Sequence, residues 1–222
     1  MNLFGLFASK KKVKSGRLPD ESFREMVSFA EEKGFRSSVA ELMPAKVLEI
    51  APRQRSLSAF FKEKGAEVTR LGGAVEQEMG TPGAAFVFSH WENFPFLDAT
   101  WGAVFLRLPF LRESKGRALR EAGRLVKEGG KLYLTDFHPF SLSVQKEALK
   151  SAASADGMGP GFEWYFRLFQ ELGLKIESVQ EVFFDGSLKK FFGKEEKLLE
   201  PLRRTPFLIL FGLRKESSRA DR

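Results

Sequence analysis

Short apolar runs alternate along the chain with segments in which apolar residues recur every three or four positions. The short runs are typical of buried strands, and the longer period is typical of amphipathic helices. This pattern predicts seven strands, over residues 47–50, 67–71, 86–88, 103–108, 131–135, 176–184 and 207–213. It predicts a first helix that begins at Pro19 and Asp20, and three further helices over residues 56–64, 113–126 and 162–172.

The order of these elements predicts how the sheet is built. Residues 47–71 read as strand, helix and strand, which is the order of a βαβ unit with parallel strands. Because the alternation continues, we expect an α/β domain with a doubly wound, mainly parallel sheet and helices on both faces. Residues 207–213 are almost continuously apolar, so this strand should be buried on both sides.

The periodicity of the predicted helices indicates which residues face inward, and glycines indicate where elements end. Met26, Val27 and Ala30 share one face of the first helix, and Gly34 follows its last lysine as a stop signal. Gly129 and Gly130 predict a turn before the fifth strand. In the helix over residues 162–172 the predicted inward residues are Phe162, Tyr165, Phe166, Phe169 and Leu172.

Two stretches fall outside the regular pattern. Residues 137–161 have no strong period and are rich in glycine near their end, which predicts a loop or lid. Residues 1–18 place Leu3 and Phe4 ahead of lysines 10–12, the reverse of the order in a secretory signal. We expect a basic arm over residues 1–18, one domain over 19–215 and a disordered tail over 216–222.

Composition narrows the chemistry. The chain has no cysteine and two histidines, which excludes disulfides and thiolate metal sites and leaves too few ligands for a zinc centre without carboxylates. We expect a metal-free protein of the cytoplasm. No stretch is long enough to span a bilayer.

The net charge of +7 lies at the two ends of the chain. Residues 1–17 carry five cations and no acid, and residues 214–222 carry four cations and two acids, so residues 18–213 are neutral overall. This distribution argues against a nucleic-acid partner. The arm could make a weak contact with an anionic membrane surface, or it could pack on the domain as a short helix or a frayed tail.

Two runs in the middle of the chain carry the motifs of one known family. Residues 91–104 read W-E-N-F-P-F-L-D-A-T-W-G-A-V, and residues 118–132 read A-L-R-E-A-G-R-L-V-K-E-G-G-K-L. They resemble the acidic loop, D-A-E-x-L-P-F-x-D-x-S-F-D-x-V, and the run A-L-R-E-x-x-R-V-L-K-P-G-G-x-L of the class I S-adenosylmethionine-dependent methyltransferases. The similarity is to the branch that includes ubiquinone, menaquinone and malonyl-carrier-protein methyltransferases.

The closing segments 138–139, 173–176 and 206–210 also resemble that family, so the similarity extends over about residues 44–215. It implies a Rossmann-like, mainly parallel seven-stranded sheet with an antiparallel last strand. It also implies S-adenosylmethionine as cofactor.

The cofactor loop departs from the family pattern. Residues 47–55 match V-L-D/E-x-G-x-G-x-G in strand and acid, but Ala51, Arg53 and Arg55 occupy the three glycine positions. Gly72 and His90 stand where the family has the acids for ribose and for adenine. The resemblance implies that the cofactor-binding residues are Glu49, Ala51, Arg53, Arg55, Gly72, His90, Trp91, Glu92 and Arg107.

Several polar residues have two readings. Arg53 and Arg55 could bind an anion, or they could be solvated loop arginines. His138 could take a proton from the acceptor as a catalytic base, or it could only order the turn before Pro139. Asp136 carries the same ambiguity and fits a turn residue better.

The sequence therefore supports two functions. The first is a divergent S-adenosylmethionine-dependent methyltransferase with a small or lipid-like acceptor, for which aromatic residues such as Trp164, Phe166 and Phe183 could line a pocket. Core packing is the commoner use of such residues. The alternative is a catalytically inactive methyltransferase-like protein that binds an anionic metabolite or a protein partner in the same cleft. The oligomeric state is left open.

Overall fold

The computed structural model describes residues 21–39, 46–51, 56–73, 84–90, 93–111, 114–139, 161–192 and 205–217. The strands are β1 (Lys46–Ile50), β2 (Glu67–Gly72), β3 (Ala85–Phe88), β4 (Trp101–Arg107), β5 (Val126–Phe137), β6 (Leu174–Phe183) and β7 (Pro206–Lys215). The helices are α1 (Glu21–Ser38), α2 (Ser58–Glu63), α4 (Lys115–Leu125), α6 (Phe162–Glu171), the 3₁₀ turn η1 (Gly186–Leu188) and α7 (Lys189–Phe192). The predicted arm and most of the predicted lid lie outside the described residues.

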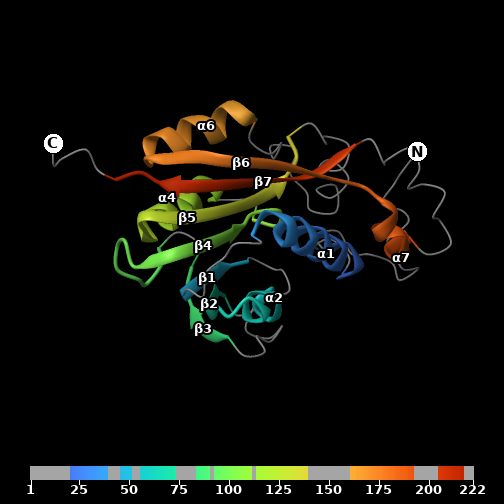
Figure 1. The fold of residues 1–222 in the computed structure, drawn as a ribbon, viewed down its shortest axis with the longest axis horizontal. Helices are drawn as coiled ribbons and strands as arrows, with labels where there is room; N and C mark the ends of the chain where they lie inside the picture. Colours follow the sequence, from blue (N-terminus) through green and yellow to red (C-terminus); the bar gives the residue numbers. More distant parts are fainter. Residues whose placement is uncertain are drawn as a thin grey trace.

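All seven strands form one sheet in the order β3-β2-β1-β4-β5-β7-β6 (Figure 1). Strands β1 to β5 pair in parallel, whereas β7 runs antiparallel to both β5 and β6. The strand order turns back between β1 and β4, which is the doubly wound arrangement. The predicted Rossmann-like fold with an antiparallel last strand is confirmed.

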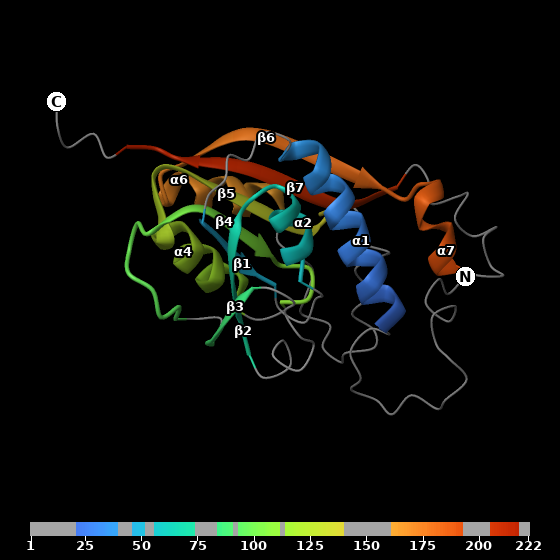
Figure 2. The ribbon, with the colours of Figure 1, turned by 60° about the horizontal axis from the view of Figure 1, so that its bottom comes forward.

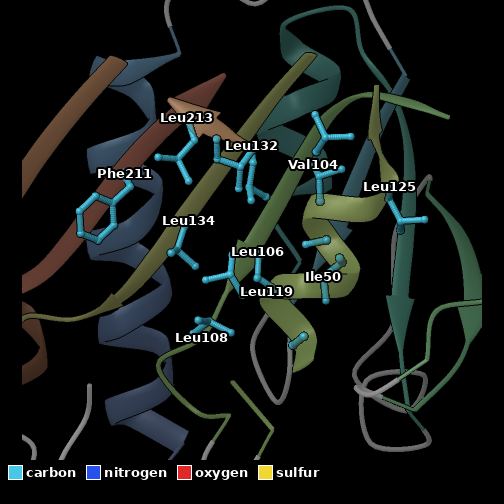
Figure 3. Close-up of a cluster of buried hydrophobic side chains, with 14 of the residues drawn as sticks. Ile50, Val104, Leu106, Leu108, Leu119, Leu125, Leu132, Leu134, Phe211 and Leu213 are labelled. Carbon is cyan, nitrogen blue, oxygen red and sulfur yellow. The ribbon is translucent and has the colours of Figure 1, made fainter. Parts of the chain in front are cut away.

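Helices cover both faces of the sheet (Figures 1 and 2). One buried cluster joins α1 and α2 to the sheet through residues such as Val27, Phe61 and Phe105. The other joins α4 and α6 to the opposite face, and Figure 3 shows Leu119 of α4 beside sheet residues such as Leu106. The residues of β7 from Phe207 to Leu213 are buried, as their apolar run predicted.

Helix α1 does not stop at Gly34 but continues to Ser38, so the predicted stop signal is wrong. Gly34 lies against the sheet: a Cβ at this position would be 2.7 Å from Leu210 Cδ2 and 3.1 Å from Val182 Cγ2. The glycine therefore permits close helix–sheet packing and does not end the helix.

Strand β5 begins directly after α4, earlier than predicted. Trp101 pairs with Val126 and Ala103 pairs with Lys131, so residues 127–130 lie opposite Gly102 alone. Gly129 adopts a φ of 71° there. The predicted glycine turn is thus an irregularity inside a longer strand.

The inward face of α6 is narrower than predicted. Tyr165, Leu168 and Phe169 are buried, whereas Phe166 is 46% exposed and stacks on Phe162 with 6.1 Å between ring centroids. The prediction of Phe166 as a core residue is wrong, and Leu168 takes the core position instead. Within the described ranges, no helix combines the length and the apolar character needed to cross a membrane.

Candidate functional site

The carboxyl ends of β1 and β4 mark the candidate site. Open α/β sheets bind ligands outside the carboxyl edge at the point where the strand order reverses, and here that point lies between these two strands. Ala51 follows β1 and Leu108 follows β4, and both side chains are fully buried. The predicted cofactor residues Glu49 and Arg107 lie at the same edge, near the ends of their strands.

Glu49 links β1 to the start of α2. The backbone N–H of Leu57 donates to Glu49 Oε1 at 2.7 Å, and the Ser56 hydroxyl donates to Glu49 Oε2 at 2.6 Å. The Ser56 hydroxyl oxygen in turn accepts from the backbone N–H of Ser58 at 3.0 Å. One carboxylate thus satisfies donors at the beginning of the helix, where backbone N–H groups have no partner within the helix.

Arg107 is fully buried between two carboxylates from different elements. Its Nη1 donates to Glu49 Oε1 at 2.8 Å, and its Nη2 and Nε donate to Glu31 Oε2 at 2.7 and 3.0 Å. Thr135, which pairs with Arg107 across β4 and β5, donates its hydroxyl proton to Glu31 Oε1. We call Glu31, Glu49, Arg107 and Thr135 the Arg107 cluster.

Burial and the charges within the cluster shift the pKa values of Glu31 and Arg107. Desolvation raises the pKa of Glu31 even though Arg107 opposes the rise. For Arg107, desolvation lowers the pKa, but attraction to Glu31 and Glu49 outweighs it and leaves the pKa raised. Removal of one partner from such a buried pair typically costs about 3–5 kcal/mol, because the remaining charge is left without compensation.

The other predicted cofactor residues lie on other segments of the chain or outside the described residues. Gly72 ends β2, and its carbonyl oxygen accepts from the backbone N–H of Ser89 at 2.9 Å. His90 is exposed and forms an isolated antiparallel bridge with Asn93. The remaining predicted members, Arg53, Arg55, Trp91 and Glu92, lie outside the described residues.

Glu121 and Arg124 of α4 hold the segment that follows His90, a role that the sequence did not reveal. Arg124 Nη1 donates to the carbonyl oxygen of Phe96 at 2.8 Å, and Nη2 donates to that of Phe94 at 3.1 Å. Glu121 Oε2 accepts from Arg124 Nη2 at 2.7 Å and from the backbone N–H of Phe94 at 2.9 Å. Opposite charges three positions apart in a helix were the available signal, but they did not identify the partner.

His138 follows β5 and is fully buried. Its Nε2 lies 2.9 Å from Glu181 Oε1, and its ring packs edge-on against Phe162 with 5.5 Å between centroids. These contacts connect the end of β5 to β6 and to the first residue of α6. They are contacts of the kind expected if His138 only orders the turn before Pro139.

Asp136 lies inside β5 and not in a turn. Its carboxylate accepts from Lys115 Nζ at 2.6 and 2.7 Å and from the Tyr165 hydroxyl at 2.5 Å. Desolvation and the Asp136 charge raise the pKa of Tyr165 well above its ordinary value. This second buried cluster lies on the α4 and α6 face, opposite the Arg107 cluster, and ties the two helices to the sheet.

The aromatic residues divide between core and surface. Tyr165 and Phe184 are buried, whereas Phe166 and Phe183 are exposed. Trp164 is partly buried and packs against the α4 and α6 cluster. Among the described residues, no three His, Asp or Glu side chains form a group that could hold a metal ion.

No family model matches the sequence, and none of the curated proteins matches it either. Solved structures do match. An S-adenosylmethionine-dependent methyltransferase from Mesorhizobium loti is 15% identical with a TM-score of 0.63, covering 85% of this chain and 99% of that one. A structure of the Haloferax volcanii Trm112 activator with a putative methyltransferase is 16% identical with a TM-score of 0.63, covering 90% of this chain and 100% of that one.

A third solved structure includes ligands. Geranyl diphosphate C-methyltransferase from Streptomyces coelicolor A3(2), in complex with Mg²⁺, geranyl diphosphate and S-adenosyl-L-homocysteine, is 12% identical with a TM-score of 0.63. The match covers 86% of this chain and 80% of that one. At these identities the likeness establishes the fold.

Proposed function

We propose that this chain is a divergent S-adenosylmethionine-dependent methyltransferase that transfers a methyl group to a small or lipid-like acceptor. The observation that supports it is the strand order β3-β2-β1-β4-β5-β7-β6, with its reversal at the carboxyl ends of β1 and β4. Solved S-adenosylmethionine-dependent methyltransferases share this fold. One of the similar enzymes holds geranyl diphosphate, which supports a lipid-like acceptor for this chain.

The residues at the sheet edge fit an adenosyl group. Ala51 follows β1 and Gly72 ends β2, so both small residues lie at the carboxyl edge where open sheets bind ligands. The exposed imidazole of His90 can hydrogen-bond an adenine edge through either ring nitrogen. The bound cofactor would supply the electrophilic methyl group, and these residues would hold its adenosyl part beside β1 and β2.

The rival function is a catalytically inactive protein that binds an anionic metabolite or a partner protein in the same cleft. Glu49 favours it, because its carboxylate already accepts from Arg107, Ser56 and Leu57. The arginines at positions 53 and 55 also favour it, since they place cationic side chains where the pattern of the resembled family has glycines.

Calorimetric titration with S-adenosylhomocysteine separates the two functions. The proposal predicts saturable heat with the full-length protein, whereas no heat at millimolar ligand would support the rival. His90→Asp should tighten binding about tenfold, since a carboxylate accepts a charge-assisted hydrogen bond from the adenine amino group. Leu97→Asp, at a residue seven positions further along the chain that is 79% exposed, adds the same charge and should leave the affinity unchanged.

Methyl transfer is tested next with methyl-labelled S-adenosylmethionine. Prenyl diphosphates and small-molecule acceptors are offered separately, and label in the extracted product identifies the acceptor class. Binding of S-adenosylhomocysteine without transfer to any of them would favour the inactive alternative.

Contact between the basic arm and a membrane remains a proposal of its own. Flotation with anionic liposomes, using the full chain and a chain without residues 1–17, tests it. Loss of flotation on truncation supports the contact, and identical behaviour removes it.

A further inference from the structure

Arg107 fixes the orientation of the Glu49 carboxylate. Oε1 of Glu49 is shared by Arg107 Nη1 at 2.8 Å and the backbone N–H of Leu57 at 2.7 Å, while Oε2 accepts from Ser56. Glu49 pairs with Phe105 in the register of β1 and β4, so Arg107 lies two residues further along on the same face. The guanidinium therefore holds the oxygen that accepts from the start of α2.

Arg107 is held in turn by α1. Nε and Nη2 both donate to Glu31 Oε2, and Glu31 is itself bonded by Thr135. A planar guanidinium can bond two carboxylates on different edges at once, which an ammonium group does less well. A continuous path of buried polar contacts thus runs from α1 through Arg107 and Glu49 to Leu57.

This path ends beside the candidate site. Ala51 follows β1 directly, and Ser56 and Leu57 are held to β1 through Glu49. Ala51 and Ser56 are therefore both attached to β1, the first through the chain and the second through the Glu49 carboxylate. The position of Ser56 depends on a carboxylate whose plane is set by Arg107.

We propose that Arg107 is a positioning residue for the adenosyl site, which acts through Glu49 and makes no contact with the ligand. This inference rests on the proposed function for its ligand. It makes α1 part of the site, because Glu31 fixes the guanidinium. Glu49 likewise holds the start of α2 and is not itself a group that binds the cofactor.

The test compares Arg107→Lys with Tyr165→Phe. Lysine keeps the charge but cannot bridge Glu31 and Glu49 with the same geometry. Tyr165→Phe removes an equally buried hydrogen bond, from the Tyr165 hydroxyl to Asp136 at 2.5 Å, on the opposite face of the sheet. Each variant is measured for amide exchange at Leu57, for S-adenosylhomocysteine affinity and for thermal midpoint.

Arg107→Lys should speed exchange at Leu57 and weaken S-adenosylhomocysteine binding, each by about tenfold, the loss expected for one charge-assisted hydrogen bond. Tyr165→Phe should lower the thermal midpoint and leave both other readouts unchanged. Unchanged exchange at Leu57 in Arg107→Lys overturns the inference, as does an equal effect of Tyr165→Phe on affinity.

Two further cases are a variant that does not fold and a wild-type chain that does not bind S-adenosylhomocysteine. If Arg107→Lys does not fold, Glu31→Gln replaces it, because glutamine retains the side-chain shape and weakens the hydrogen bonds to Arg107. Faster amide exchange at Leu57 in this variant supports the inference, and unchanged exchange overturns it. If the wild-type chain binds no S-adenosylhomocysteine, the proposed function fails and the adenosyl part of the inference falls with it. Exchange at Leu57 still decides whether Arg107 positions the start of α2.

Discussion

Glu121 accepts a hydrogen bond from the backbone N–H of Phe94 at 2.9 Å, which joins α4 to the segment after β3. Arg124 donates to two carbonyl oxygens of the same segment, those of Phe94 and Phe96. These bonds make the position of the segment depend on α4. The segment follows His90, which is a predicted cofactor residue.

Arg124→Leu should lower the free energy of unfolding by about 2 kcal/mol, because it removes hydrogen bonds from a charged donor to backbone carbonyls. The matched control is Arg120→Leu on the same helix, where the exposed Arg120–Glu171 pair at 3.4 Å should contribute less than about 0.5 kcal/mol. Urea unfolding of both variants measures the difference. Equal losses would contradict the role assigned to Arg124.

Acid should weaken the same contact. The hydrogen bond from Arg124 is the largest factor that lowers the pKa of Glu121 below 4.5. A carboxyl whose pKa is lower in the folded state stabilises it above the unfolded pKa, and this contribution is lost as the pH falls through the folded pKa. Glu121→Gln should therefore flatten the fall in stability below about pH 4.5 relative to wild type. Glu171→Gln is the control, and an equal flattening there would argue against Glu121.

The two tyrosines should resist ionisation in the folded protein. Burial raises the pKa of Tyr133 to about 12, and desolvation together with the Asp136 charge raises that of Tyr165 well above its ordinary value. Raised pKa values stabilise the folded state fully below the unfolded pKa near 10, and this stability is lost as the pH rises from about 10 through 12. At about pH 11, phenolate absorbance should be small in the folded protein and should appear on unfolding. Full absorbance before unfolding would contradict the burial of both rings.

Gly130→Ala should destabilise the domain by about 1–3 kcal/mol. A Cβ there would be 2.8 Å from the carbonyl oxygen of Lys127 and 3.1 Å from that of Gly102, and backbone atoms cannot move aside as a side chain can. Gly161→Ala is the control, since a Cβ at Gly161 meets nothing within 4 Å. Thermal unfolding of both variants tests the comparison, and a neutral Gly130→Ala would show that the strand irregularity can relax.

The sheet was predictable because each strand carries its own signal. The apolar runs at β1, β4 and β7 are local, and the resemblance supplied the antiparallel last strand. Gly34 was misread because its role is set by Leu210 and Val182, which are distant in sequence. Phe166 has the helical period of a core residue, but it lies on a side of α6 where it stays exposed and stacks on Phe162.

The candidate site was predictable in position more than in contacts. Glu49 and Arg107 were both among the predicted cofactor residues, and the structure brings them together at 2.8 Å. Their bond to each other and the contribution of Glu31 could not be read from the sequence, because Glu31 lies in a helix before the matching motifs. Ion pairs between residues far apart in the chain produce no periodic pattern in the sequence.

The role of His138 can be settled by a double-mutant cycle with Glu181. Because the imidazole is fully buried and its Nε2 is bonded to Glu181 at 2.9 Å, we expect a structural role. His138→Asn should then lower the free energy of unfolding by about 1–2 kcal/mol, and Glu181→Ala should add little to it, since both changes remove the same contact. Methyl transfer, measured with labelled cofactor, should stay within about threefold of wild type. A fall of about a hundredfold in kcat at unchanged S-adenosylhomocysteine affinity would instead identify His138 as the proton acceptor, because a lost general base costs that much.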